Sequence, residues 1–371
     1  MKYYIIAGEA SGDLHGANLI KALKREDVFA HFRCWGGALM EVEGGVLVKD
    51  YRNLDFMGFW EVLKCLPKIL RNIRFCKGDI RAYRPDVVIL IDYPGFNLRV
   101  ANFVNKLSIK VFYYISPKVW AWKRSRVYRI EKTVDKMFVI LPFEKDFYKR
   151  YGVDVEFVGH PILDAIHTKV TMSQEDFIRK HRLDERPIIA LLPGSRRAEI
   201  SYMFPLMWSM RKVFPAYQFV VAGVSSQPRA YYEALVGEEV CWVEAQTYDL
   251  LACSKAALVT SGTATLETAL FGVPQVVCYK GGRISYEIAR YLVRHIRFIS
   301  LVNLIMDRDV VEELIQKSFT SKKLERALSR ILDPEHRALL FSDYRGLSER
   351  LGGPGASQRI AQRMVTVLKS S

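Results

Sequence analysis

Residues 257–274, ALVTSGTATLETALFGVP, carry the pattern that decides the fold. The apolar run Ala257–Thr260 predicts a buried strand, and the Ser-Gly-Thr that ends it predicts a turn that opens a helix. A second apolar run, Gln275–Cys278, predicts another strand directly after that helix. Strand, helix and strand in this order are the repeating unit of a parallel sheet covered by helices.

The same alternation extends through most of the chain. In the first half the predicted strands are Tyr3–Ala7, Phe32–Trp35, Val87–Ile91, Val111–Ile115, Lys136–Ile140 and Val155–Val158. In the second half they are Ile188–Leu192, Gln218–Ala222, Val240–Val243, Ala257–Thr260 and Gln275–Cys278. We therefore expect an α/β protein with two doubly wound, Rossmann-like domains facing a cleft.

The domain limits follow from where strand character is lost. Residues 159–174, GHPILDAIHTKVTMSQ, predict a linker, and after Asp309 only helical patterns remain. We expect a first domain over residues 1–165, a second over 166–344, and a helical tail whose last part, 345–371, completes the first domain.

Composition limits the class of protein. Half of the 371 residues are hydrophobic and 26% are charged, which is typical of a globular protein without disorder. The amino-terminal apolar stretch is too short for a signal peptide, and no run approaches about 18 apolar residues. The six cysteines show no metal-binding spacing, so we expect free thiols in a reducing cytoplasm. The net charge of +15 favours an anionic partner: nucleic acid, a phosphorylated substrate or an anionic membrane face.

Two turns in the second half are candidates for a nucleotide-diphosphate site. They comprise Gly194, Ser195 and Arg196 after one strand, and Ser261, Gly262 and Thr263 after another. Free N–H groups at a helix start bind phosphate, and ligands of open parallel sheets sit beyond the carboxyl ends of the strands. Neither turn is specific alone, and Arg196 could be an ordinary surface arginine, so the prediction depends on the pair.

Acidic residues near these turns have two interpretations each. Glu267 lies about one turn into the helix, where sugar-nucleotide transferases place a carboxylate that accepts hydrogen bonds from ribose hydroxyls; the alternative is a solvated carboxylate. The sequence Asp307-Arg308-Asp309 matches a metal-binding Asp-x-Asp loop, but Asp309 precedes VVEELIQK, where an acidic helix cap is expected. We expect neither a metal nor a cofactor, with Arg196 and the helix dipole neutralising a leaving diphosphate.

In the first half, two further turns follow predicted strands. The first, AGEASGDLHG, has the composition of a dinucleotide fingerprint but not its spacing, and could instead cradle a phosphate on an acceptor. Its candidate acceptor-binding residues are Glu9, Ser11, Gly12 and Asp13. The two carboxylates either orient sugar hydroxyls or cap the helix that starts near Ser11.

Asp92 ends the buried strand VVILID, and Tyr93-Pro94-Gly95 then forces a turn. A carboxylate at the end of a central strand is well placed as the general base for a sugar hydroxyl. The alternative is a cap for the helix from Phe96 onward.

A basic amphipathic pattern covers residues 59–77, FWEVLKCLPKILRNIRFCK. Its predicted membrane contacts are Phe59, Trp60, Leu63, Leu66, Ile69 and Leu70. This segment is either an ordinary helix packed on the sheet or one whose apolar face enters the headgroup layer beside anionic lipid. Residues 113–132, with interleaved aromatics and cations, also suit single-stranded nucleic acid, but no RNP-type or helix-turn-helix pattern accompanies them.

Read together, eight motifs resemble the lipid-A-disaccharide synthases in sequence and in order. They are AGEASGD, MGFWEVL, IDYPGFN, YYISPKVWAWK, VGHP, LLPGSR, TSGTATLE and LVNLI, spanning residues 7–305. The resemblance implies the B-type glycosyltransferase fold, with the acceptor site in the first domain and the donor site in the second. It also implies an inverting reaction in which UDP-2,3-diacylglucosamine and 2,3-diacylglucosamine 1-phosphate give a β-1′,6-linked disaccharide 1-phosphate and UDP.

The resemblance also implies residue roles. Asp92 and Arg196 match the family's catalytic aspartate and cleft arginine, Glu267 and Asn303 match nucleotide-side residues, and 59–73 matches its membrane-facing helix. Two departures are Val302, where the family usually has proline, and Tyr93 with Gly95, where alanine and aspartate are common.

The implied location is the cytoplasmic face of the inner membrane of a Gram-negative bacterium, as a peripheral protein. The implied partners are the UDP-sugar donor, the phosphorylated acylated acceptor and the anionic membrane surface, but not nucleic acid. The helical tail could also join a homodimer. The alternatives are another UDP-sugar enzyme of this fold, such as a UDP-N-acetylglucosamine 2-epimerase or the lipid II N-acetylglucosaminyltransferase, or a non-catalytic nucleic-acid-binding protein.

Overall fold

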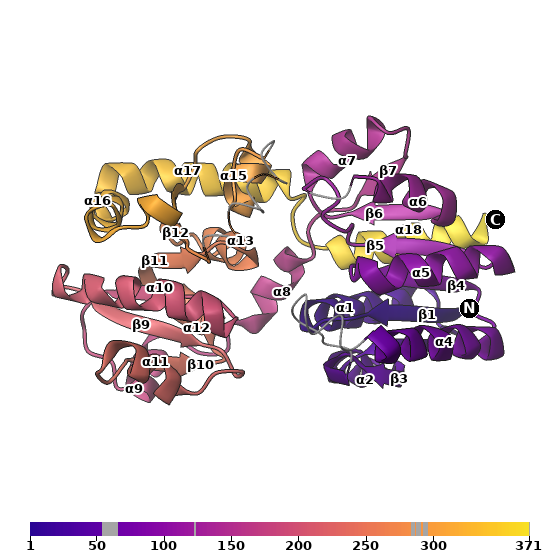
Figure 1. Ribbon diagram of the computed structural model, residues 1–371, viewed down its shortest axis with the longest axis horizontal. Coiled ribbons are helices and arrows are strands. Elements are labelled where there is room, and N and C mark those ends of the chain that lie inside the picture. The colour runs from indigo at the N-terminus through magenta and orange to yellow at the C-terminus, as the bar shows by residue number, and fades with distance from the viewer. Residues whose placement is uncertain (54–65, 122–123, 283–285, 287–290, 292–295, 371) are drawn as a thin grey trace. The chain divides into compact units, whose positions relative to one another are not determined.

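The computed structural model describes residues 1–53, 66–121, 124–282, 286, 291 and 296–370 (Figure 1). The chain forms two compact units, Met1–Pro161 with Leu351–Ser371, and Ile162–Arg350. It therefore enters the second unit after Pro161 and returns to the first after Arg350. The boundaries expected from the sequence, at 165 and 344, lie close to these crossings.

The first unit is built around a seven-stranded sheet. Its elements are β1 (Lys2–Ala7), α1 (Ala10–Glu26), β2 (His31–Gly36), α2 (Ala38–Val42), β3 (Val46–Asp50), η1 (Tyr51–Asn53), α4 (Leu66–Tyr83), β4 (Val87–Ile91), α5 (Pro94–Val104), η2 (Asn105–Leu107), β5 (Lys110–Tyr114), α6 (Arg126–Thr133), β6 (Lys136–Val139), α7 (Pro142–Lys149), β7 (Val155–Phe157) and α18 (Ala356–Lys369). The strands are parallel, in the order β3-β2-β1-β4-β5-β6-β7.

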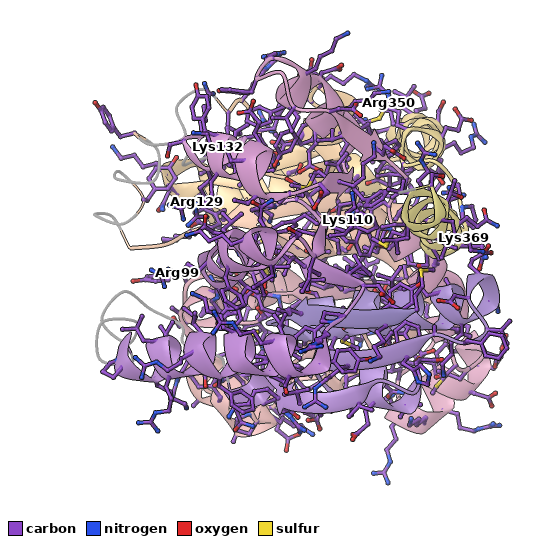
Figure 2. All side chains as sticks on the ribbon, turned by 90° about the vertical axis from the view of Figure 1, so that its right-hand side faces the viewer. Arg99, Lys110, Arg129, Lys132, Arg350 and Lys369 are labelled. Atoms are coloured by element: carbon purple, nitrogen blue, oxygen red, sulfur yellow. The ribbon has the colours of Figure 1, made fainter. Side chains whose placement is uncertain are left out.

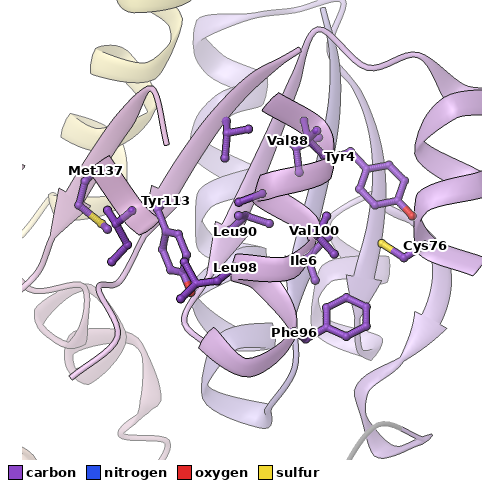
Figure 3. Close-up of a cluster of buried hydrophobic side chains, with 14 of the residues drawn as sticks. Tyr4, Ile6, Cys76, Val88, Leu90, Phe96, Leu98, Val100, Tyr113 and Met137 are labelled. Atoms are coloured by element: carbon purple, nitrogen blue, oxygen red, sulfur yellow. The ribbon is translucent and has the colours of Figure 1, made fainter. Parts of the chain in front are cut away.

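Helices bury both faces of this sheet. Strand side chains alternate between the faces, and those of one parity pack with α4, α5 and α6 in the cluster that Figure 3 shows around Leu90, Val100 and Tyr113. Those of the other parity pack with α1, α2 and α18. The last helix of the chain, α18, therefore packs in the same hydrophobic cluster as the first strand, β1.

The second unit repeats the plan with six strands. Its elements are α8 (Ile162–Lys169), α9 (Gln174–His181), β8 (Ile188–Leu192), α10 (Arg197–Ser209), η3 (Met210–Lys212), β9 (Gln218–Gly223), α11 (Arg229–Val236), β10 (Trp242–Glu244), α12 (Thr247–Ala252), β11 (Ser254–Thr260), α13 (Thr263–Leu270), β12 (Gln275–Tyr279), α15 (Leu301–Met306), β13 (Glu312–Ile315), η4 (Gln316–Ser318), α16 (Ser321–Leu332) and α17 (Pro334–Arg350). The strands are again parallel, in the order β10-β9-β8-β11-β12-β13. Two doubly wound sheets with a helical end are thus confirmed.

The structure corrects three local expectations. The run VVEELIQK is not a helix, because Glu312–Ile315 forms the edge strand β13, which pairs with β12. Asp309 consequently caps no helix, and its carboxylate lies 3.6 Å from the guanidinium of Arg297. The stretch predicted as a linker contains α8, and the edge strand β3 was not predicted at all.

The two chain crossings are tied together within the first unit. The N–H of His160 donates to the carbonyl of Leu351 at 2.9 Å. The guanidinium of Arg359, on α18, donates to the carbonyl oxygens of Val158, Gly352, Gly353 and Pro354 at 2.7–3.2 Å. One side chain thus holds backbone from both crossings.

The packing of α18 predicts a stability effect. Ile360 is fully buried among α1 and sheet side chains, so Ile360→Ala should lower the free energy of unfolding by about 2–5 kcal/mol. Urea unfolding measures this, with the exposed Gln362→Ala on the same helix as the control. Equal midpoints for the two variants would show that α18 is not part of the core.

Candidate active site

The candidate loops of each unit lie where its strand order reverses. In the second unit, β8 leads to β9 and β10 on one side and β11 leads to β12 and β13 on the other. Leu192 and Val259 are partners in the register, so the turns after β8 and β11 begin side by side. In the first unit Ala7 pairs with Ile91, which places the turns after β1 and β4 together in the same way. Such switch points are where open α/β sheets bind their ligands.

The turn after β8 presents hydrogen-bond donors. Gly194 has a φ of +113°, and a Cβ there would lie 2.7 Å from Oε2 of Glu199. The N–H groups of Ser195 and Arg196 donate to this same oxygen at 3.2 and 3.3 Å. The Arg196 guanidinium is 3.6 Å from the other carboxylate oxygen, and its side chain is 66% exposed. This turn therefore holds an anionic group, the carboxylate of Glu199.

The turn after β11 is more open. Gly262 is the N-cap of α13 and has no side chain that could cap the helix. A Cβ on Gly262 would meet no atom within 4 Å, and both Gly262 and Thr263 are exposed. The hydroxyl of Ser261 donates instead to the carbonyl of Ile299 at 2.9 Å. The backbone at this helix start is thus accessible to an anion, whereas the Ser261 hydroxyl has a structural partner.

Glu267, about one helical turn along α13 from Thr263, lines a depression. The hydroxyl of Tyr248 donates to Oε1 of Glu267 at 2.6 Å. The depression has a volume of about 650 Å³ and is lined by Thr171, Ala245, Gln246, Thr247, Tyr248, Asp249 and Glu267. It is large enough for part of a small organic ligand, and it offers carboxylate, amide and hydroxyl groups.

Asn303 is held by bonds within the second unit. Its side chain is fully buried. Its amide NH₂ donates to the carbonyl of Val311 and to Glu313, and its oxygen accepts from the N–H groups of Val310 and Val311, all at 2.9–3.0 Å. An asparagine side chain has two donors and two acceptor sites, and all four are used. Asn303 therefore fixes the chain leading into β13, and the nucleotide contact expected for it stays a prediction.

In the first unit, Asp92 sits at a strained turn. Asp92 and Tyr93 both have left-handed backbone, with φ of 42° and 47°, and so does Ile115 after the neighbouring β5, with a φ of 64°. Left-handed backbone is costly for residues with side chains, above all for a β-branched one, and such strain concentrates at functional sites. The turn also needs Gly8, because a Cβ there would lie 2.4 Å from the Tyr93 ring.

Backbone hydrogen bonds hold this turn in place. The carbonyl of Asp92 accepts from the hydroxyl of Tyr113 at 2.5 Å and from the amide of Asn97 at 2.8 Å. The N–H of Asp92 donates to the carbonyl of Tyr114 at 3.2 Å. These bonds fix the main chain, so the carboxyl group is held at the carboxyl end of β4. No side-chain cap exists for α5, so the capping alternative does not apply.

The surroundings of Asp92 make it a stronger base. Its pKa rises from 3.8 to about 6, first because of burial and then because of the negative charge of Glu9. The positive charge of Lys118 and the N–H of Tyr93 oppose the rise in pKa. A carboxyl with this pKa is mostly ionised at neutral pH and still accepts a proton readily.

The other acceptor-side candidates divide into two groups. Glu9 and Ser11 are exposed at the start of α1, and Gly12 packs beneath them against Ala7. Asp13 is buried, and its carboxylate accepts from the N–H groups of Gly37, Leu39 and Met40 at 2.7–3.3 Å. Asp13 therefore caps α2, a different helix from the one expected.

The predicted membrane contacts lie partly outside the described residues. Phe59, Trp60, Leu63 and the side chain of Leu66 belong to that part. On α4, Ile69 is half-buried, whereas Leu70 is 54% and Phe75 52% exposed. No helix in the described part of the chain is long and apolar enough to cross a membrane.

Three contributors could not be found from sequence patterns. Glu199 occupies the anion-holding turn, Lys118 acts on Asp92 from the loop after β5, and Tyr248 binds Glu267. Glu199 and Tyr248 look like ordinary helix residues, and only the strand order brings Lys118 near Asp92. Among the described residues, no three of the His, Cys, Asp and Glu side chains come together in a group that could hold a metal ion.

Comparison with known proteins identifies the relatives of this chain. Residues 3–360 match the family model described as lipid-A-disaccharide synthetase. The lipid-A-disaccharide synthase of Syntrophus aciditrophicus is 38% identical over 99% of this chain and 98% of its own. That of Geobacter metallireducens is 38% identical over 98% and 96%, respectively.

Solved structures share the fold at much lower identity. The putative UDP-N-acetylglucosamine 2-epimerase from Listeria monocytogenes has a TM-score of 0.70 and 15% identity, covering 100% of this chain and 97% of its own. S. aureus MnaA in a co-structure with UDP has a TM-score of 0.71 and 14% identity, covering 99% and 97%. These likenesses concern the fold alone.

The raised pKa of Asp92 predicts a stability effect that depends on pH. A carboxyl whose pKa is higher in the folded than in the unfolded state stabilises the fold fully only below the unfolded value, and that stability is lost as the pH rises through about 6. Asp92→Asn removes this loss, so it should raise the free energy of unfolding by about 1–3 kcal/mol at about pH 7.5.

The gain in the free energy of unfolding of Asp92→Asn should shrink at about pH 5 and disappear near pH 4. Urea titrations at several pH values test this, with the exposed Asp146→Asn as a control that should show no such trend. A loss of stability at neutral pH would contradict the assignment of Asp92 as a destabilised, ionised carboxylate.

Proposed function

Because the chain belongs to the lipid-A-disaccharide synthase family, we infer that it is a glycosyltransferase that forms the lipid A disaccharide. Its donor is UDP-2,3-diacylglucosamine and its acceptor 2,3-diacylglucosamine 1-phosphate. The reaction joins the anomeric carbon of the donor to the acceptor 6-hydroxyl. The observation that supports the residue assignment is the position of Asp92 and of the Gly194–Arg196 turn at the two switch points.

The second unit binds the donor. Its diphosphate takes the N–H groups of Ser195 and Arg196 together with those at the start of α13, and the exposed Arg196 guanidinium adds a full positive charge. Glu267 accepts hydrogen bonds from the ribose hydroxyls in the depression that it lines. These groups stabilise the charge that develops on UDP as it leaves.

The first unit binds the acceptor and supplies the base. The Asp92 carboxylate accepts the proton of the 6-hydroxyl as the hydroxyl oxygen attacks the anomeric carbon. The bond from that carbon to the diphosphate oxygen breaks on the opposite face, and its electron pair leaves with UDP. Attack from that face inverts the configuration and gives the β-linkage.

Two alternatives to this function can be separated from it by assay. An epimerase would act on UDP-N-acetylglucosamine without an acylated acceptor. A nucleic-acid-binding protein would instead show oligonucleotide affinity that falls steeply with salt, and it would have no use for the placement of Asp92.

The face of the first unit that carries α4 supports a membrane contact. Leu70 and Phe75 are exposed among Lys68, Arg71 and Arg74 on α4. Figure 2 shows further cations on the helices that cover this face of the sheet, with Arg99 on α5 and Arg129 and Lys132 on α6. Exposed apolar side chains among cations suit the headgroup layer of an anionic membrane, where each cation contributes about 1 kcal/mol. We propose that this face meets the cytoplasmic surface of the inner membrane, from which both acylated substrates come.

The catalytic assignment predicts a selective loss of turnover. Purified protein with both acylated substrates and EDTA should yield the disaccharide 1-phosphate, detected by mass spectrometry. Asp92→Asn should lower kcat by about 10²–10⁴-fold while UDP affinity stays within about twofold. In the unaltered protein kcat/KM should fall about tenfold per pH unit below about 6, because protonated Asp92 cannot accept a proton.

Asp146→Asn, which alters an exposed carboxylate on α7, should keep full activity. Full activity of Asp92→Asn would remove Asp92 from the role of base. Conversion of UDP-N-acetylglucosamine without acceptor would favour the epimerase.

The membrane assignment predicts a charge-dependent binding defect. Vesicles with about a third anionic phospholipid should bind the unaltered protein, and the triple change Lys68→Glu, Arg71→Glu, Arg74→Glu should weaken binding at least tenfold. Leu70→Ser with Phe75→Ser should also weaken it, whereas Leu339→Ser, an exposed leucine on α17, should not. Unchanged sedimentation of both α4 variants with vesicles would exclude this face.

A further inference from the structure

A hydrogen bond joins two walls of the depression in the second unit. The hydroxyl of Tyr248, on α12, lies 2.6 Å from Oε1 of Glu267, on α13. The two helices flank β11 in the sequence, and both side chains line the depression. A bond from a hydroxyl to a carboxylate at this distance is of the strong, charge-assisted kind. It therefore constrains the orientation of the Glu267 carboxylate.

Tyr248 is itself held firmly. Its ring packs on Phe271, with ring centroids 5.3 Å apart, at the border of the hydrophobic cluster of this unit. The next residue, Asp249, is buried and accepts from the N–H and the hydroxyl of Thr171 at 2.7 and 3.0 Å. These contacts fix the start of α12, so the Tyr248 hydroxyl has a defined position.

The Tyr248 hydroxyl stays protonated and can therefore donate to Glu267. Burial raises its pKa well above the ordinary value, and the charge of Glu267 raises it further. The hydroxyl therefore stays protonated at any physiological pH. An ionised carboxylate offers about four acceptor positions, so a bond from Tyr248 is compatible with further bonds to a ligand diol.

Orientation matters because glutamate has several rotamers. Ordering a flexible side chain on binding costs about 0.5–1.5 kcal/mol, and a carboxylate that is already oriented avoids that cost. A vicinal diol such as the ribose 2′- and 3′-hydroxyls needs two acceptors in a fixed relation. A preset carboxylate therefore favours a ribonucleotide over its 2′-deoxy analogue by more than a mobile one does.

We propose that Tyr248 is a positioning residue that presets the Glu267 carboxylate for the ribose diol of the donor, and so makes the enzyme selective for ribonucleotides. This inference rests on the proposed function, in which Glu267 meets the donor ribose. The competing role is purely structural, in which the bond only ties α12 to α13. The two roles differ in what happens to nucleotide discrimination.

The test compares UDP with 2′-deoxy-UDP. The unaltered protein should bind UDP more tightly, as measured by calorimetry. Tyr248→Phe keeps the ring on Phe271 and should weaken UDP binding about tenfold, because the carboxylate is no longer oriented by a charge-assisted bond. Binding of 2′-deoxy-UDP should change by less than about threefold, so that the ratio of the two affinities falls.

Two further variants make the result specific. In a Glu267→Ala background, Tyr248→Phe should leave the ratio unchanged, since Tyr248 acts through Glu267. Tyr83→Phe, which removes a hydroxyl that donates to the carbonyl of His31 at 3.1 Å in the first unit, should also leave it unchanged.

Each outcome decides a different point. A Tyr248→Phe protein that binds both nucleotides with an unaltered affinity ratio would overturn the role of Tyr248 but leave the donor site intact. An unaltered protein that binds UDP without discriminating against 2′-deoxy-UDP would overturn the contact between Glu267 and ribose, and the inference with it. Absence of any UDP binding would overturn the donor site itself.

Discussion

Parallel strands whose order reverses leave a gap that their own connections cannot fill. The segments after β1 and β4, and after β8 and β11, run to opposite sides of their sheets, so the backbone at each junction stays accessible. Everything else in the candidate site is arranged around these junctions. The second unit uses its junction for N–H groups and a guanidinium, and the first uses its junction for a carboxylate. The same reversal of strand order therefore presents hydrogen-bond donors in the second unit and a carboxylate in the first.

Keeping the junction after β4 accessible costs folding free energy. Asp92, Tyr93 and Ile115 all have left-handed backbone, and the charge on Asp92 is opposed by burial and by Glu9. The surrounding structure offsets this cost with specific bonds: Tyr113 and Asn97 hold the carbonyl of Asp92, and Gly8 makes room for the Tyr93 ring. The stable part of the sheet therefore supports a turn that would not adopt this shape alone. The same burial and the nearby charge of Glu9 raise the pKa of Asp92.

Central features of the fold could be predicted from sequence, because buried strands are continuous apolar runs such as Val87–Ile91 and Ile188–Leu192. Edge strands could not. In β13 only Leu314 is buried, so its two glutamates resemble a helix face. Turns at strand ends pointed to Asp92 and Gly194–Arg196 as candidates, but the partners that hold other polar residues could not be predicted. Asp13 caps α2, and Asn303 fixes the chain leading into β13. The backbone groups that these two side chains bind are not visible in a local sequence pattern.

The return of the chain after Arg350 has a consequence for synthesis. The first unit begins at the amino terminus but needs α18, whose side chains cover one face of its sheet. The 189 residues of 162–350 are translated in between, which takes about 10–40 s at the usual speed of a bacterial ribosome. The domain that emerges first is therefore completed last. Until Arg359 and its helix leave the ribosome, the nascent chain carries an apolar surface that chaperones can recognise.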